Sequence, residues 1–234
     1  MAIRIFDGAE ALSEAAAAHL LQLLSASTGS FDLCLSGGST PKKLYTILAS
    51  PAYRDDVPWS RVHFWFGDER FVPPTDPDSN ERMAREAMLD HVPVPPENIH
   101  GMYQDSTAEE AAERYERELR AQLGDKGFDL LLLGLGPDAH TASLFPHDPS
   151  IDEKQKWVVA STGAAGVKQR LTLTPPVLNA SKQVLFLVAG DDKAVPLANV
   201  LNGLEDVHQY PAQIVARNAK DVLWFLDDKA AAKL

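Results

Sequence analysis

The sequence predicts an α/β fold in which helices cover both faces of a mainly parallel sheet. Seven short apolar runs, rich in leucine, aromatic and β-branched residues, are typical of strands that are buried on both faces. Stretches with helical periodicity lie between many of these runs. Because strand and helix alternate along the chain, we expect ligands to bind beyond the carboxyl ends of the strands.

The chain begins directly with a strand and a helix, and the apolar runs follow in order. The predicted strands occupy residues 31–36, 61–67, 128–136, 157–161, 170–174, 183–190 and 221–227. No internal repeat, low-complexity tract or interdomain linker interrupts this series. We therefore expect one α/β domain over residues 1–234.

Four helices are predicted between the strands, at residues 9–25, 79–90, 107–123 and 191–202. The third has the clearest start signal, because Thr107 and Glu110 have the spacing of a capping box. Its charged residues at i and i+4 are most simply a solvated face. In the fourth helix, Pro196 is compatible with helical structure only near the start.

Composition and charge restrict the classes of partner. With 234 residues, of which 45% are hydrophobic and 24% charged, the chain has the composition of an ordered globular protein. Its 33 acidic and 22 basic residues give a formal charge of −11, which disfavours nucleic acid or an acidic membrane as the main partner. An anionic small molecule would therefore need locally clustered basic residues.

The single cysteine and the apolar stretches point to a cytoplasmic protein. Cys34 lies inside an apolar run and is expected to be an inert core thiol. No apolar stretch reaches the roughly 18 residues of a membrane span, and the first residues lack the apolar core of a signal peptide. The sequence does not indicate an oligomeric state.

The first candidate site lies in LSGGSTPKKLY, residues 35–45. This stretch fits a strand that ends near Ser36 and a helix with Thr40 as its N-cap and Pro41 in its first position. Glycines let backbone N–H groups approach an anion, and a helix N-terminus carries a partial positive charge. A tight turn with a good cap and two surface lysines is the alternative, and the spacing is not that of a Walker loop. The candidate phosphate ligands are Gly37, Gly38, Ser39 and Thr40.

A second candidate group follows the next apolar run. Asp68, Glu69 and Arg70 should emerge together at the carboxyl end of the strand at residues 61–67. Arginine is well shaped for bidentate binding of a phosphate or carboxylate, and an acid nearby can hold it in place. A structural salt bridge is the alternative interpretation of Arg70.

A third candidate group is the pair Asp138 and His140, in the loop after the strand at residues 128–136. Histidine is the natural general base near neutral pH, and a carboxylate beside it can orient the ring. The other six histidines have no comparable neighbour in the sequence. His140 is therefore the candidate base, with a structural role as the alternative.

Two other interpretations of this loop are disfavoured. Gly134, Gly136 and Ala139 match the G-x-G-x-x-G/A pattern of dinucleotide sites. That pattern needs a long helix directly afterwards, yet Pro146 and Pro149 interrupt the following segment. A zinc site is weakly supported, because no further cluster of histidine or cysteine completes a ligand set. We predict neither a cofactor nor a metal.

At these three loops the chain resembles the 6-phosphogluconolactonases, hydrolases of the pentose phosphate pathway, and the resemblance covers nearly its whole length. The resemblance is carried by LSGGSTPKKLY, FWFGDERFVPPTDPDSNERM, LLLGLGPDAHTASLFP, QRLTLTPPVLNAS and VLFLVAGDDKA. It implies a Rossmann-like sheet similar to the glucosamine-6-phosphate deaminase fold. It also implies hydrolysis of 6-phospho-D-glucono-1,5-lactone to 6-phospho-D-gluconate without a cofactor.

The resemblance also implies roles for individual residues. His140 would be the general base that activates water, and Asp138 would orient the imidazole or the substrate. Arg70 and Arg170 would both be site residues, with their division between oxyanion and phosphate left open. The substrate- or phosphate-binding residues would be Gly37, Gly38, Ser39, Thr40, Asp68 and Lys193.

One position departs from the family pattern. The family usually has glycine between the aspartate and the histidine, whereas this chain has Ala139. If that position requires a positive φ, alanine carries a cost of about 1 kcal/mol or more.

Two other classes share this architecture. A glucosamine-6-phosphate deaminase would carry tyrosine after the D-E pair and an F-N-E-P ending after the histidine. Here Arg70 follows the pair, and Phe145 replaces the acid expected for ring opening, which favours lactone hydrolysis. A sugar-phosphate sensor domain of a bacterial repressor would carry an appended helix-turn-helix, whereas this chain starts directly with strand and helix.

Overall fold

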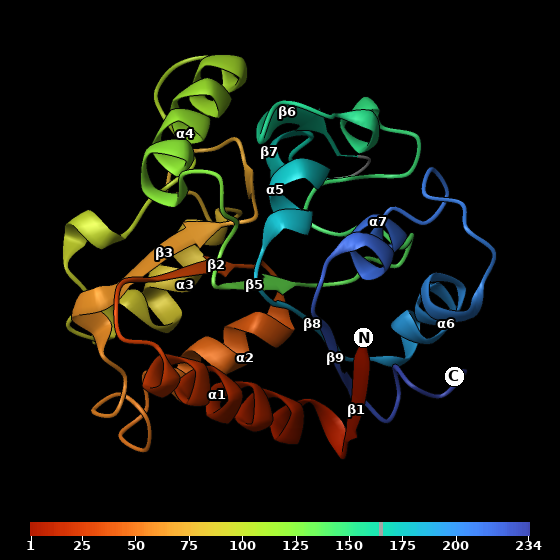
Figure 1. Cartoon of the computed structure of the whole chain (residues 1–234), viewed down its shortest axis with the longest axis horizontal. Helices are drawn as coiled ribbons and strands as arrows, with labels where there is room; N and C mark the ends of the chain where they lie inside the picture. Colours follow the sequence, from red (N-terminus) through yellow and green to blue (C-terminus); the bar gives the residue numbers. More distant parts are fainter. Residues whose placement is uncertain (164–165) are drawn as a thin grey trace.

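The centre of the molecule is a six-stranded parallel sheet, seen in a computed structural model that describes residues 1–163 and 166–234 (Figure 1). The strand order is β1-β9-β8-β5-β2-β3, and every neighbouring pair is parallel. The strands are β1 (Ala2–Phe6), β2 (Phe31–Leu35), β3 (Val62–Phe66), β5 (Leu130–Leu133), β8 (Val184–Val188) and β9 (Val222–Asp227). The chain runs outward from β2 to β3 and, in the opposite direction, from β5 to β9. The topological switch point therefore lies between β2 and β5, where ligands of such sheets bind.

Helices lie on both sides of this sheet, with α1 and α2 on one side and α5 and α7 on the other (Figure 1). The α-helices are α1 (Gly8–Ala26), α2 (Ser39–Leu48), α3 (Asn80–Ala87), α4 (Ala108–Leu123), α5 (Pro175–Ala180), α6 (Ala194–Asn202) and α7 (Ala212–Asn218). The 3-10 helices are η1 (Trp59–Arg61), η2 (Leu89–His91), η3 (Pro96–Asn98), η4 (Pro149–Asp152) and η5 (Asp191–Lys193). Within the described ranges, no helix has both the length and the apolar character that a membrane crossing requires. The predicted fold class, a mainly parallel sheet covered by helices, is confirmed.

A second, three-stranded sheet departs from the predicted pattern. The expected strands at 157–161 and 170–174 become β6 (Val158–Thr162) and β7 (Gln169–Leu173), which pair with each other antiparallel. A short connection allows only an antiparallel pair, because a parallel pair needs a long crossover. The third strand, β4 (Asp68–Arg70), was expected to be loop, and it pairs antiparallel with β7. This pairing places residues far apart in sequence side by side.

The helix at 107–123 forms as the sequence predicts. Thr107 is the N-cap of α4, and its side chain accepts from the Glu110 N–H while the Glu110 side chain accepts from the Thr107 N–H. The expected i,i+4 pair of Glu116 and Arg120 is present at 2.8 Å on the solvated side. Pro196 likewise lies in the first turn of α6, where it removes no helical hydrogen bond.

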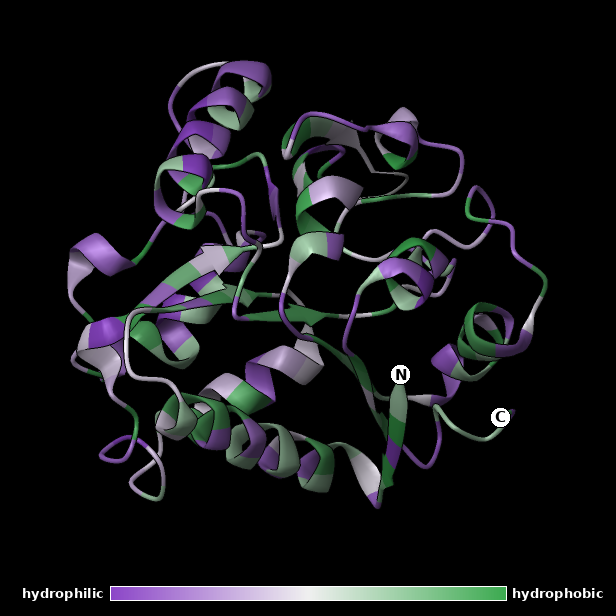
Figure 2. Cartoon of the chain, viewed as in Figure 1, coloured by the Kyte–Doolittle hydropathy of each residue, from purple (hydrophilic) through white to green (hydrophobic). Residues whose placement is uncertain are grey.

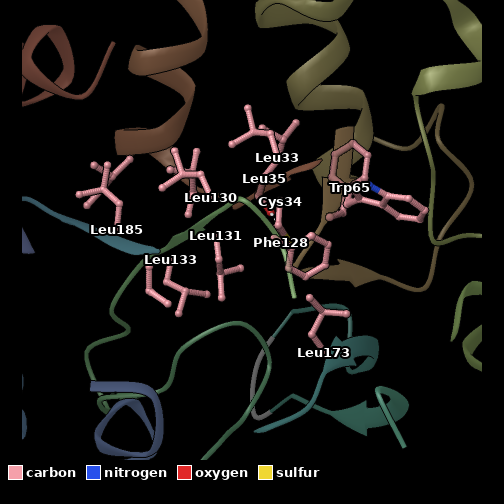
Figure 3. Close-up of a cluster of buried hydrophobic side chains, with 14 of the residues drawn as sticks. Leu33, Cys34, Leu35, Trp65, Phe128, Leu130, Leu131, Leu133, Leu173 and Leu185 are labelled. Atoms are coloured by element: carbon pink, nitrogen blue, oxygen red, sulfur yellow. Dashed lines mark hydrogen bonds between the residues drawn. The ribbon is translucent and has the colours of Figure 1, made fainter. Parts of the chain in front are cut away.

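The hydrophobic core is centred on the parallel strands. Figure 2 shows hydrophobic residues concentrated on these strands and hydrophilic residues along α4. Figure 3 shows Cys34 among the buried side chains of β2 and β5, in one cluster with Leu173 of β7. Burial, with a smaller contribution from the charge of Asp68, raises the pKa of the Cys34 thiol. The prediction of an inert core cysteine agrees with this position.

Two of the histidines form a pair that the sequence does not reveal, because they lie 37 residues apart. His63 Nδ1 lies 3.1 Å from His100 Nε2, and the His100 ring stacks on Trp65 with centroids 3.8 Å apart. Burial, followed by the charges of His63 and Arg114, lowers the pKa of His100 from its ordinary 6.5 to about 4. A protonated His100 is therefore disfavoured in the folded protein.

We expect this pair to make the fold sensitive to acid. Between about pH 6.5 and pH 4 the unfolded chain binds a proton that folded His100 resists, so the free energy of unfolding falls as the pH is lowered through this window. The contribution should be roughly 1–2 kcal/mol, since water screens a partly buried ring. Urea unfolding at pH 7, 6 and 5 measures it. In His100→Phe, which keeps an aromatic ring on Trp65, the fall should be shallower, and an unchanged slope would contradict the assignment.

Candidate active site

A cavity of about 240 Å³ lies at the carboxyl ends of the strands around the switch point. It is lined by Ser36, Gly37, Gly38, Asp68, Arg70, Asn80, Gly134, Leu135, Gly136, Pro137, His140, Thr141, Ala142 and Lys193. An adjoining hollow of about 290 Å³ shares Arg70 and His140 with it. This hollow adds Asp138, Ser143, Phe145 and Arg170. The three loops singled out in the sequence therefore meet in one place.

The loop after β2 differs from the prediction at the start of its helix. Helix α2 begins at Ser39 with Gly38 as the N-cap, so Thr40 is not the cap and Pro41 occupies the third position. Gly38 has φ 104°, a backbone conformation that glycine adopts readily and other residues rarely adopt. Because glycine has no side chain, Gly38 provides no side-chain cap. The first N–H groups of α2 have no intrahelical acceptor and no capping side chain, which leaves them available to a ligand.

Gly37 is required because another side chain occupies the space beside it. A Cβ at Gly37 would lie 2.2 Å from Asn80 Oδ1. Asn80 is buried, and its Nδ2 donates to the backbone oxygen of Asp68 at 3.0 Å. The Asn80 amide thus packs between the loop after β2 and the start of β4. Asn80 was not among the predicted site residues, since only the folded chain brings it to Gly37.

Gly37→Ala should therefore damage the site and also lower the stability of the fold. The new methyl group must displace the buried Asn80 amide, which costs about 1–3 kcal/mol of stability by overpacking and breaks its bond to Asp68. We expect a lower affinity for a phosphorylated ligand, measured by calorimetry, together with a lower urea midpoint. Gly29→Ala is the matched control, because a Cβ there meets no atom within 4 Å. Equal behaviour of the two variants would contradict this role of Gly37.

Strand β4 brings two arginines together. Arg70 lies opposite Arg170 in the antiparallel register, so both side chains project from the same face of the small sheet. Arg70 Nη1 donates to the backbone oxygen of Asp78 at 2.5 Å, and within the described residues no carboxylate forms an ion pair with it. The alternative of a structural salt bridge is therefore wrong for Arg70. Burial, followed by the charge of Arg70, lowers the pKa of Arg170.

The two acids beside Arg70 have different surroundings. Asp68 lines the cavity, and its Oδ2 accepts a hydrogen bond from Ser143 Oγ at 2.7 Å. Glu69 points away from it and is only 1% exposed. Burial raises the pKa of Glu69 to about 7, while hydrogen bonds from the N–H groups of Asn80, Glu81 and Arg70 act in the opposite direction.

Asp138 and His140 form the expected pair. His140 Nδ1 lies 2.5 Å from Asp138 Oδ1, so the carboxylate engages Nδ1 and leaves Nε2 as the other ring nitrogen. Burial alone would raise the pKa of Asp138, but the hydrogen bond and charge of His140 outweigh it and hold this pKa below its usual value. A Cβ at Gly136 would lie 2.1 Å from Nδ1, so glycine is needed there for the ring to fit. The pair can accept a proton from a molecule in the cavity.

Ala139 adopts the conformation that glycine would favour. Its φ is 65°, in the left-handed region, and its backbone oxygen accepts from the Ala212 N–H at 3.0 Å. A left-handed alanine costs about 1–2 kcal/mol relative to a right-handed one. The residues from Gly134 to Asp148 form turns and an isolated bridge rather than a long helix. A dinucleotide site would need a long helix here, so this structure agrees with the argument against such a site.

The remaining predicted residues divide into two groups. Lys193, at the end of η5, lines the cavity and pairs with Asp192 at 2.7 Å. Ser39 and Thr40 form the first turn of α2, and Ser39 lines a separate shallow hollow beside Lys43. Among the lining residues that the prediction missed, those with polar or aromatic side chains are Ser36, Asn80, Thr141, Ser143 and Phe145. Phe145 packs on His140 with ring centroids 4.7 Å apart.

Comparison with known proteins is consistent with this geometry. The family model of glucosamine-6-phosphate isomerases/6-phosphogluconolactonase matches residues 7–224. A 6-phosphogluconolactonase of Synechocystis is 41% identical over 215 residues, which are 89% of this chain and 87% of that protein. The 6-phosphogluconolactonase structure from Trypanosoma cruzi superimposes with a TM-score of 0.87 at 27% identity, covering 100% of this chain and 96% of the other. A monomeric glucosamine-6-phosphate deaminase, 24% identical over 100% of both chains with a TM-score of 0.84, shares the fold.

Proposed function

Because the chain belongs to the glucosamine-6-phosphate isomerase/6-phosphogluconolactonase family, we propose that it hydrolyses 6-phospho-D-glucono-1,5-lactone to 6-phospho-D-gluconate. One observation carries the proposal most strongly. His140, which Asp138 holds at Nδ1, lines the same cavity as Gly37 and Gly38 before α2 and as Arg70 and Lys193. A base for water and a cationic site for phosphate are the two elements that this reaction needs.

The proposed reaction uses water as its only co-reactant. His140 Nε2 takes a proton from water as its oxygen attacks C1 of the lactone, and Asp138 stabilises the imidazolium through Nδ1. The bond between C1 and the ring oxygen then breaks, and the ring oxygen receives the proton from His140. The product is the open-chain carboxylic acid, which ionises at neutral pH.

The cationic residues are assigned to the negative charges of this reaction. The N–H groups at the start of α2, reached past Gly37 and Gly38, bind the phosphate together with Lys193. Arg170 lines the hollow beside Asp138 and His140, so it stabilises the oxyanion at C1. Arg70 lines both the main cavity and the adjoining hollow, so it contributes to phosphate binding and to stabilisation of the oxyanion. Asp68, held by Ser143, accepts from a sugar hydroxyl rather than binding phosphate.

Deamination is the second reaction known on this fold, and Phe145 argues against it. The position where ring opening requires an acid carries an aromatic ring that packs on His140. A sensor domain would bind the sugar phosphate without hydrolysing it. Both alternatives are kept as outcomes of the experiment.

The experiment generates the lactone in the cuvette from glucose 6-phosphate and follows its disappearance with and without the protein. The lactone also hydrolyses unaided, so the rate without protein is subtracted. Lactone loss well above this background, without ammonia release from glucosamine 6-phosphate, is the expected result. Ammonia release would favour the deaminase, and no rate above background with retained sugar-phosphate binding would favour the sensor.

We propose the cytoplasm as the place of action and a small sugar-phosphate lactone as the partner. A phosphorylated lactone carries a charge that is costly to transfer into a bilayer, so an enzyme for it is useful where the substrate is made. The formal charge of −11 also disfavours nucleic acid.

A further inference from the structure

Glu69 is a buried carboxylate that the proposed mechanism does not use. Its Oε1 accepts from the Arg70 N–H at 2.8 Å and from the Asn80 N–H at 2.7 Å. Its Oε2 accepts from Ser79 Oγ at 3.0 Å and from the Glu81 N–H at 2.8 Å. Four donors on two oxygens give this side chain a complete set of partners.

These bonds join two separate elements. Glu69 belongs to β4, whereas three of its donors lie at the N-cap and in the first turn of α3. A negative charge at this end of a helix is favourable, because the N–H groups there have no intrahelical acceptors. The carboxylate therefore fixes the start of α3 against β4 and sets the shape of the loop between them.

Two of the residues that donate to Glu69, Arg70 and Asn80, also line the cavity. Arg70, whose N–H binds Glu69, also donates through Nη1 to the Asp78 oxygen just before α3. Asn80, whose N–H binds the same oxygen, places its amide against Gly37 and donates to the Asp68 oxygen. A shift of α3 relative to β4 would move the Arg70 guanidinium and loosen the contact with the loop after β2.

We propose that Glu69 is a positioning residue for sugar-phosphate binding, which acts by holding Arg70 and Asn80 in place at the cavity. This inference rests on the proposed function. Loss of this carboxylate would also leave its buried donors without an acceptor, so stability alone does not separate a positioning role from a structural one and the tests measure binding. Precise placement of Arg70 and Asn80 is a functional reason for the carboxylate, since a displacement of about 1 Å at a binding group can cost up to about 10²-fold in rate.

The first test compares Glu69→Gln with Asp32→Asn. In Glu69→Gln one oxygen becomes an NH₂ group, which cannot accept from the Arg70 and Asn80 N–H groups in the Oε1 position or from the Glu81 N–H in the Oε2 position. Asp32→Asn makes the same change at another buried carboxylate, which is only 8% exposed and accepts from Trp65 at the amino end of β2. We expect KM for the lactone to rise about tenfold or more in Glu69→Gln, with a smaller change in kcat, and to stay unchanged in Asp32→Asn.

The second test asks whether Glu69 acts through Arg70. The affinity for the product 6-phosphogluconate is measured by calorimetry for wild type, Glu69→Gln, Arg70→Ala and the double variant. If Glu69 positions Arg70, the effect of Glu69→Gln should be at least about threefold smaller in the Arg70→Ala background. A loss of equal size in both backgrounds would show that Glu69 does not act through Arg70 and would overturn this part of the proposal.

A third variant covers the case in which Glu69→Gln does not fold. Ser79→Ala keeps the carboxylate, but it removes one of the four donors and also the N-cap oxygen that accepts from the Arg82 N–H. We expect about two- to fivefold weaker product binding, and a smaller effect in the Arg70→Ala background. Unchanged product binding in this variant would overturn the proposal. A wild type without catalysed lactone hydrolysis would overturn the proposed function and this inference together. An active wild type with Glu69→Gln equal to Asp32→Asn would overturn this inference alone.

Discussion

His140→Ala should lose nearly all catalysed lactone hydrolysis, with kcat lowered by about 10²- to 10⁴-fold, the usual contribution of a general base. The reason is the geometry of the pair: Asp138 holds Nδ1 at 2.5 Å, so the lone pair on Nε2 is the proton acceptor that the cavity offers to water. Binding should change far less, because the proposed phosphate ligands belong to other loops. Initial rates after subtraction of the spontaneous reaction, together with calorimetric binding of 6-phosphogluconate, measure the two effects separately.

The chain offers a matched control for this substitution. His208 also lies near an aspartate, with Nε2 3.7 Å from Asp152 Oδ1, but its side chain is 48% exposed and lies outside both hollows. His208→Ala should keep the wild-type rate. If His140→Ala retains more than about a tenth of the wild-type kcat, which is well above the range for a lost general base, the assignment of His140 is wrong.

Arg70→Ala should lower kcat/KM by about 10²- to 10³-fold, the loss typical of a missing charge-stabilising donor. Arg70 lines both the main cavity and the adjoining hollow, so in the proposed binding mode it reaches both ends of the substrate. The fold should survive, because the guanidinium's own hydrogen bond is to a single backbone oxygen of Asp78. Steady-state kinetics and thermal unfolding of the same preparation test both statements.

Arg82 provides the control for Arg70. Its Nη1 donates to the Thr75 backbone oxygen at 2.8 Å, in the same loop that Arg70 contacts, and its Nε pairs with Glu86 at 2.7 Å. Arg82→Ala therefore removes a guanidinium bond to the loop without removing a charge from the cavity. Equal kinetic losses in the two variants would assign the effect to the loop rather than to substrate binding.

The parts of the fold that the sequence predicts are those determined by neighbouring residues. The strand at Phe31–Leu35 is a continuous apolar run, and the helix at Ala108–Leu123 has its capping box within four residues. The pair Asp138 and His140 was equally visible, because both side chains lie in one short loop after a strand. Local patterns of this kind do not depend on the rest of the chain.

The missed features depend on contacts between distant segments. Asn80 looks like an ordinary first-turn residue of α3, and only folding brings its amide to the space beside Gly37. Strand β4 has three residues and no apolar pattern, so its pairing with β7 could not be read from composition. The start of α2 was misplaced because Pro41 suits several positions of a first turn, and the φ of Gly38 decided between them.

The register that sets Arg70 opposite Arg170 has a practical consequence for any measurement on this protein. Two like charges on adjacent strands repel each other, and a dianion that enters between them relieves this repulsion. Inorganic phosphate or sulfate from a buffer should therefore compete with the substrate and raise the apparent KM. The same ions should raise the melting temperature, because a ligand that binds only the folded state stabilises it. Kinetic constants for this enzyme are best compared in buffers without multivalent anions.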